Sequence, residues 1–247
     1  GGYSRRNKST DDATELTFYT NYSKKFESVP GKIDIILGYF SLKRSYTYSS
    51  FETNLDSPAM VINNVKGDGE NNQTSLFGRL KYSMYDRYEL GFTLRRDGNS
   101  KYTETFRYSY FPAASFAWDI KKEQFMAPVS SLSELKLRIG YGTSGAFQPS
   151  HESDDAIHAK VSSLNLGVDY GVFYNKIRGS VNLYRCISDN LPYSVLIPAG
   201  ASFYYVLFYD GKCVNKGFDF STEATVVSRS DIYWTVGVNG GFNRNKM

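Results

Sequence analysis

Two histidines and three acidic residues form the densest group of potential metal ligands in this sequence. They are His151, Glu152, Asp154, Asp155 and His158. Imidazole and carboxylate groups bind zinc, but this spacing does not match the helix-borne His-Glu-x-x-His arrangement of zinc enzymes. An exposed acidic loop is the simpler interpretation of the segment.

A glycine-rich segment, Gly140-Tyr-Gly142-Thr-Ser-Gly145, matches the GxGxxG spacing of dinucleotide-binding proteins. That motif needs a helix directly after it, because the helix N-terminus receives the pyrophosphate. Here a polar stretch containing Pro149 follows instead. The glycines are better explained as strand positions where a side chain is excluded or the strand curves.

Other catalytic arrangements are missing. No serine stands in a GxSxG elbow, and no nucleophile is paired with a recognisable base. Glu89, Asp169 and Glu223 alternate with apolar residues, which assigns them to strand faces rather than to a catalytic pair. Asp68 and Glu70 are candidate calcium ligands in an outer loop, although the full calcium-loop pattern is absent. We therefore predict a protein that is not an enzyme, with no cofactor beyond this candidate calcium ion.

The polar residues belong to segments of strict period two, which is typical of strands with one apolar face. The clearest case is Leu164–Tyr174. One face there carries Leu164, Leu166, Val168, Tyr170 and Val172. The other face carries Asn165, Gly167, Asp169 and Gly171.

The same pattern predicts about ten strands, each near the roughly 9 to 11 residues of a tilted transmembrane strand. They are Leu16–Tyr22, Lys32–Phe40, Leu76–Met84, Arg87–Arg96, Phe111–Ile120, Leu135–Tyr141, Leu164–Tyr174, Ile177–Cys186, Phe218–Val226 and Ile232–Phe242. Polar loops are predicted for residues 44–74, after residue 96, and for residues 145–160, and a proline-containing connection for residues 187–217. The predicted fold class is therefore all-β.

The amino-acid composition excludes several classes of protein. Of the 247 residues, 16% are aromatic, and the net charge of +4 is spread among acids rather than clustered. This gives no support to nucleic-acid binding. The mean hydropathy is −0.42, and the lack of a run of about 18 apolar residues excludes a helical membrane protein. A barrel is not excluded, because its strands alternate lipid-facing apolar residues with polar ones, and the mean hydropathy averages over both. The two cysteines, Cys186 and Cys213, show no motif spacing, so we interpret them as incidental, with a disulfide between them as the alternative.

The lengths of the predicted connections follow a parity rule: short and long connections alternate along the chain. Those after the first, third, seventh and ninth strands are tight, those after the second, fourth, sixth and eighth are long, and only residues 121–134 blur the rule. Outer-membrane barrels have short periplasmic turns and long outer loops, whereas a β-sandwich mixes the two. Both ends of the chain then lie on the outer side. We therefore expect residues 1–247 to be part of a longer barrel protein, with its plug and N-terminal domains outside this sequence.

An ordered set of motifs resembles the SusC/RagA family of TonB-dependent outer-membrane transporters of Bacteroidetes. The motifs are Gly78–Tyr82, Arg96–Ser100, Phe111–Trp118, Leu135–Gly145, Asn165–Tyr170 and Asn215–Asp219. One departure is that residues 146–164 replace a longer stretch of the family pattern. The plug, the TonB-contacting segment and the closing strand of the family have no counterpart in these residues.

The resemblance implies that the chain is a segment of a larger, 22-stranded antiparallel barrel in the outer membrane. It also implies that the whole protein imports oligosaccharides or peptides with energy transmitted by TonB, together with a SusD-like surface lipoprotein. Membrane lipid and lipopolysaccharide are further expected partners. The alternatives are a passive or adhesive outer-membrane barrel, a soluble carbohydrate-binding β-sandwich, and a membrane-barrel hydrolase that would use His151 and His158.

On the barrel hypothesis, polar residues on the strands line the lumen. The candidates are Arg79, Lys81, Glu89, Arg95, Arg138, Asp169 and Glu223. Aromatic residues near strand ends, Trp118, Tyr141, Tyr174 and Trp234, are predicted to lie at the membrane interfaces. Loop aromatics, Phe147, Tyr193 and Phe203, could stack on sugar rings or contact a lipoprotein lid.

Overall fold

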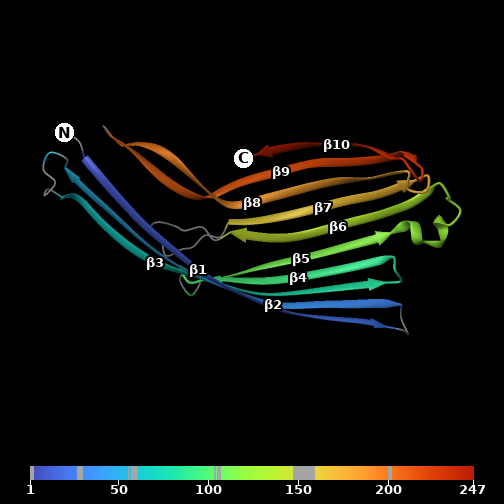
Figure 1. Cartoon of the computed structure of the whole chain (residues 1–247), viewed down its shortest axis with the longest axis horizontal. Coiled ribbons are helices and arrows are strands. Elements are labelled where there is room, and N and C mark those ends of the chain that lie inside the picture. Colours follow the sequence, from blue (N-terminus) through green and yellow to red (C-terminus); the bar gives the residue numbers. More distant parts are fainter. Residues whose placement is uncertain are drawn as a thin grey trace.

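The computed structural model describes residues 3–26, 30–54, 56, 61–102, 104, 107–146, 159–199 and 202–247. These residues form one antiparallel sheet of ten strands in sequence order (Figure 1). The strands are β1 (Tyr3–Phe26), β2 (Gly31–Asn54), β3 (Val61–Met84), β4 (Tyr88–Asn99), β5 (Tyr108–Asp119), β6 (Leu132–Ala146), β7 (Ala159–Val172), β8 (Ile177–Ala199), β9 (Ser202–Ser228) and β10 (Tyr233–Lys246). Two 3-10 helices, η1 (Ile120–Lys122) and η2 (Gln124–Met126), connect β5 to β6.

The all-β prediction and the ten strands are confirmed. The tight turn after β3 is also confirmed. The φ angles of Tyr85 and Asp86 are 53° and 54°, and the Arg87 N–H donates to the Met84 carbonyl at 3.1 Å. Positive φ at both central residues defines a type I′ turn, whose twist matches that of the paired strands.

The boundaries of β7 and β4 differ from the prediction. Phe173, Tyr174 and Asn175 have φ angles of 54°, 59° and 60°, so β7 ends at Val172 and Tyr174 belongs to the turn. Residues 97–99, predicted to open a loop, still pair with β3 and β5. Backbone pairing therefore continues beyond the segments of clear alternation.

The predicted loop at residues 44–74 is wrong, because most of it extends β2 and β3 into a long hairpin. Glycine and asparagine indicate a turn when read alone. In the hairpin, however, the rings of Tyr46 and Tyr48 lie across Gly69 and Gly67 on the neighbouring strand. Each ring covers the strand backbone that a glycine, having no side chain, leaves exposed. The strands therefore continue through these glycines.

The connection predicted after Cys186 is likewise largely strand, since β8 and β9 pair as far as Ala199 and Ser202. The register shifts on either side of Leu191, next to Pro192. Proline occurs in sheets at such irregularities because it has no N–H to donate. Pro192 therefore marks an irregularity within the hairpin rather than the end of the strand.

The sheet is a single layer. Among the described residues the only buried apolar ones are Tyr102 and Ala159, and no large side chain is fully buried. A sandwich would bury one face of each strand against a second sheet. The soluble-sandwich alternative is therefore wrong. Within the same described residues, no helix has the length and apolar character needed to cross a membrane.

The register sorts side chains onto two faces. The apolar face carries, among others, Leu37, Leu94, Ile139, Leu166, Val181, Leu183, Phe218 and Val238, all exposed. The opposite, polar face carries all seven of the charged residues selected from the sequence: Arg79, Lys81, Glu89, Arg95, Arg138, Asp169 and Glu223.

The two ends of the sheet also differ. One end, the turn end, carries the tight turns and the η1–η2 connection. At the other, the hairpin end, β1, β2 and β3 extend together past β4, and the β8–β9 hairpin extends past β7 and β10 (Figure 1). The first residues of β1 and the last of β10 lie on the hairpin side (Figure 1). The parity rule therefore holds in space, although extended strands replace several of the predicted loops.

Candidate functional site

Ion pairs organise the polar face, three of them between neighbouring strands and one, Arg95–Asp97, within β4. They are Lys81–Glu89 at 2.8 Å, Arg95–Asp97 at 2.6 Å, Arg138–Asp169 at 2.7 Å and Arg178–Glu223 at 2.8 Å. Arg79 is exposed and makes no ion pair within the described part of the chain. The structure thus brings six of the seven predicted residues into pairs and leaves Arg79 open to a partner outside these residues.

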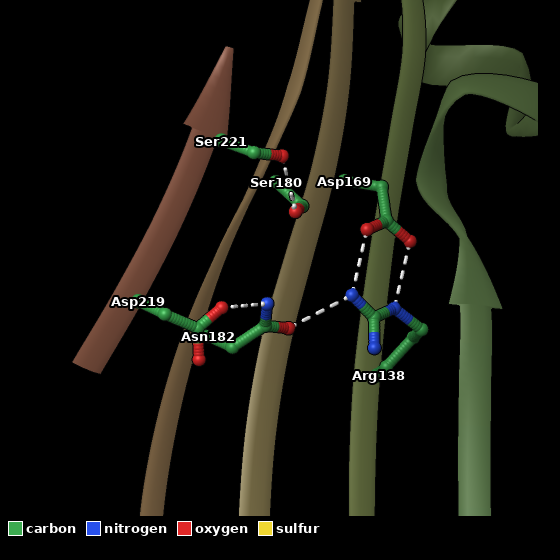
Figure 2. Close-up of polar contacts among 6 residues, drawn as sticks. All are labelled: Arg138, Asp169, Ser180, Asn182, Asp219 and Ser221. Carbon is green, nitrogen blue, oxygen red and sulfur yellow. Dashed lines mark hydrogen bonds and ion pairs between the residues drawn. The ribbon is translucent and has the colours of Figure 1, made fainter. Parts of the chain in front are cut away.

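The best-connected part of this face is a network across β6, β7, β8 and β9 (Figure 2). The Arg138 guanidinium donates to both carboxylate oxygens of Asp169, each at 2.7 Å. Its Nη2 also donates to the Asn182 carbonyl at 3.0 Å, and the Asn182 amide donates to Asp219 at 2.8 Å. A two-pronged guanidinium–carboxylate contact of this kind fixes orientation as well as charge.

Gly167 makes room for the network. It lies between Arg138 and Asn182 in the register. A Cβ added there would come within 2.7 Å of the Asn182 carbonyl oxygen and 2.9 Å of the Arg138 guanidinium. Because β-carbons do not approach other atoms so closely, a side chain at position 167 would require the ends of these two flexible side chains to shift.

A hollow of about 460 Å³ opens beside the network on the polar face. It is lined by charged, amide, hydroxyl and aromatic groups, among them Glu89, Lys136, Arg138, Asn165 and Tyr184. These groups can hydrogen-bond a polar molecule or another part of the protein. None of these five groups is a nucleophile held against a base.

A second cluster lies at the turn end, where β4 begins and β5 ends, and sequence reasoning missed it. Glu123 accepts hydrogen bonds from the Tyr88 hydroxyl, from the Trp118 indole at 3.0 Å and from Arg87 at 2.8 Å. These hydrogen bonds lower the pKa of Glu123 below its ordinary value, with the largest effect from Tyr88, then Trp118, then Arg87. We call these four residues the turn-end clamp. The available signal was the glutamate five residues after Trp118 in the segment that broke the parity rule.

The comparisons with known proteins now decide the family. A family model described as "TonB dependent receptor-like, beta-barrel" matches residues 1–246. The chain belongs to the TonB-dependent receptors. Within them it is of the SusC/RagA type that its motifs predicted.

Two curated relatives and two solved structures support this assignment. The TonB-dependent receptor SusC of Bacteroides thetaiotaomicron is 30% identical over 209 residues, which are 72% of this chain and 21% of SusC. The TonB-dependent receptor P39 of Formosa agariphila is 28% identical over 269 residues, which cover 93% of this chain and 25% of P39. The chain thus spans between a fifth and a quarter of the length of these relatives.

Among solved structures, the RagAB peptide importer in its closed-closed state has a TM-score of 0.79 at 18% identity. That alignment covers 98% of this chain and 30% of the other. The Escherichia coli outer-membrane transporter YddB has a TM-score of 0.73 at 11% identity, covering 96% of this chain and 34% of YddB. At these identities the likeness shows the fold.

The remaining candidate ligands of this receptor are not brought together. The cluster at His151, Glu152, Asp154, Asp155 and His158 lies outside the described residues. No group of three or more His, Cys, Asp or Glu that could hold a metal ion occurs among the residues that are described. Asp68 and Glu70 lie on β3 rather than in a loop, and Glu70 is 3.6 Å from Lys43.

The glycine motif of the receptor lies inside β6. Gly140 pairs with Ser115 on one side and with Asn165 on the other, so the segment does not open a helix. The cysteines are both free, and Cys186 accepts a hydrogen bond from Ser163 at 3.2 Å.

The aromatic residues divide between the two ends. Trp118, Tyr174 and Trp234 lie at the turn end, and Tyr141 is exposed on the apolar face. In the β8–β9 hairpin, Tyr193 stacks on Phe208 with ring centroids 5.4 Å apart. Phe147 and the side chain of Phe203 lie outside the described part of the structure.

Proposed function

We propose that this chain is part of the barrel wall of a SusC-like importer of the outer membrane. The whole receptor takes up oligosaccharides or peptides, driven by energy that TonB transmits, and a SusD-like surface lipoprotein assists it. The similarity to SusC and the RagAB peptide importer supports this proposal. Transport of this kind makes and breaks no bond in the substrate.

One observation carries the proposal: the sheet is a single layer whose apolar face is exposed across all its strands. In water such a face costs roughly 25 cal/mol for each Å² left uncovered. Lipid covers it without a second layer of protein. The opposite face then lines the lumen, and we place Arg79, Lys81, Glu89, Arg95, Arg138, Asp169 and Glu223 there.

The same proposal sets the orientation. Short turns face the periplasm in outer-membrane barrels, so the turn end lies inside and the hairpin end lies outside. The β2–β3 and β8–β9 hairpins then stand above the outer leaflet. They offer surfaces to a lipoprotein and to incoming substrate.

The test is substrate uptake by cells that carry or lack the full-length gene. We expect the deletion strain to lose uptake of one class, either labelled oligosaccharides or labelled peptides, and to regain it when the gene is restored. A protonophore should abolish the restored uptake, because TonB transmits energy from the inner membrane. Uptake that continues at full rate with the protonophore would identify a passive barrel instead, and substrate recovered cleaved by the purified receptor would contradict the non-enzymatic role.

A further inference from the structure

Three basic residues stand side by side on β8, β9 and β10 and interrupt the apolar face, whose next pair toward the hairpin end is Ile187 and Val214. Arg185 is the direct partner of Lys216, and Lys216 is the direct partner of Arg244. All three side chains are exposed, and none makes an ion pair or hydrogen bond within the described residues. They stand two residues from Leu183, Phe218 and Phe242, respectively, so they lie on the apolar face.

Such a row destabilises the sheet on its own. Like charges directly opposite each other on paired strands repel, and neighbouring strands are only about 4.8 Å apart. The next partner along the row, on β7, is Leu164, which supplies no counter-charge. Asp189, farther along β8 on the same face, is already paired with Lys212 at 3.2 Å. The balancing anion must therefore come from outside these residues.

The surface next to the row is apolar. Leu183, Phe218 and Phe242 form the adjacent row, with the two phenylalanine rings stacked at 6.4 Å, and Val181 and Phe220 follow. A molecule that covers both rows needs an anionic head and a hydrocarbon tail. The row of cations spans about 10 Å across three strands, which is wider than a single phosphate.

We propose that Arg185, Lys216 and Arg244 bind the phosphorylated headgroup of a lipopolysaccharide molecule, whose acyl chains lie on the apolar rows beneath. The proposal rests on the proposed function, which places the apolar face in the outer membrane and the hairpin end outside. The row then lies at the border of the outer leaflet, where the lipopolysaccharide headgroups are. The site is a lipid-binding surface distinct from the polar face.

The experiment uses the full-length receptor purified from outer membranes in mild detergent and stripped of lipid. Lipopolysaccharide binding is measured by native mass spectrometry for the wild type and for R185Q/K216Q/R244Q. Each cation near an anionic leaflet contributes about fivefold in affinity, so the triple variant should bind about 100-fold more weakly. The matched control is R6Q/K8Q/K66Q, which removes three exposed cations from the same face, farther out on the hairpin end of β1 and β3. This control should bind as the wild type does.

Two further measurements fix the identity of the ligand and the integrity of the fold. The charge-keeping variant R185K/K216R/R244K should retain lipopolysaccharide, which separates loss of charge from misfolding. Phosphatidylglycerol and inorganic phosphate, offered as competitors, should displace it weakly. Equal binding by the two glutamine triple variants, or displacement by either competitor as effective as that by lipopolysaccharide, would overturn the site. Absence of the wild-type receptor from the outer membrane would instead refute the proposed function.

Discussion

Val168 lies in the middle of the apolar stripe of β7, with Leu137 and Val181 as its direct partners on β6 and β8. On the polar side of the same strand, Asn165 is exposed and pairs with Gly140 and Tyr184. The two positions are three residues apart and differ in the medium that we assign to them. They therefore offer a test within one strand.

We predict that Val168→Arg impairs barrel assembly and that Asn165→Arg does not. An arginine facing lipid at mid-depth costs roughly 2 to 4 kcal/mol, whereas a charge facing a watery lumen costs little. The measurement is the amount of heat-modifiable, folded full-length receptor in outer-membrane fractions. Equal amounts of the two variants would show that the faces are assigned wrongly.

Gly167 provides a second test at the scale of a residue. Gly167→Ala should separate Arg138 from Asn182, because the added carbon would lie 2.7 Å from the Asn182 oxygen. We expect a loss of about 0.5 to 1.5 kcal/mol in the free energy of unfolding, the usual net contribution of one hydrogen bond, because both groups are half-exposed and water can replace the lost partner. Urea unfolding of the refolded receptor in micelles measures it.

Gly140→Ala is the matched control for this change. The atom nearest to a Cβ at position 140 is 3.9 Å away, so the substitution makes only ordinary van der Waals contact. An equal loss of stability in the two variants would mean that the effect comes from the strand backbone and not from the network.

At the scale of elements, the turn-end clamp fixes the connection between β5 and β6. Its four side chains come from the turn before β4, the start of β4, the end of β5 and the η1–η2 segment. Lys122 adds a hydrogen bond to the Asp86 carbonyl at 2.8 Å, in the turn before β4. These contacts explain why a connection of this length keeps a defined structure.

We predict that acid loosens this connection. Because the folded-state pKa of Glu123 is lowered, the stabilisation is complete above the ordinary value of 4.5 and is lost as the pH falls through the lower folded value. Hydrogen–deuterium exchange of residues 120–131, corrected for intrinsic rates, should therefore rise below about pH 4.5 in the wild type. In Glu123→Gln the same residues should exchange faster at neutral pH, and the rise in exchange below about pH 4.5, which we call the acid step, should be absent.

Glu134→Gln serves as the control, since Glu134 is exposed and makes no hydrogen bond or ion pair within the described residues. It should keep the step of the wild type. A step that survives in Glu123→Gln would assign the titration to another carboxylate.

Elements with strict alternation could be predicted from the sequence, and β7 is the clearest case. The residues at which the strands begin and end could not be predicted. Asn, Gly and Asp in residues 61–73 indicate a loop from their local preferences, but pairing with β2 and the ring of Tyr48 over Gly67 keep them in β3. The length of a strand therefore depends on its pairing with the neighbouring strand, and local residue preferences carry no information about that pairing.

At the scale of the whole molecule, the face of each charged residue was predictable and its partners were not. Period two placed Arg138 and Asp169 on one face, but only the register brings Asn182 and Asp219 into the same network. The turn-end clamp was missed for the same reason, because Tyr88 and Glu123 meet through pairing of β4 with β5. Register arises from the sum of many strand contacts and not from any one segment.

The central claim is that one face of the sheet contacts lipid and the other lines a lumen. Spin labels placed one at a time along residues 164–170 of the full-length receptor, in a background with Cys186 and Cys213 replaced by serine, test it directly in lipid vesicles. Collision with oxygen, which concentrates in lipid, should peak at positions 164, 166, 168 and 170, and collision with a water-soluble nickel complex should peak at 165, 167 and 169. A flat profile, or oxygen maxima at the odd positions, would contradict the account.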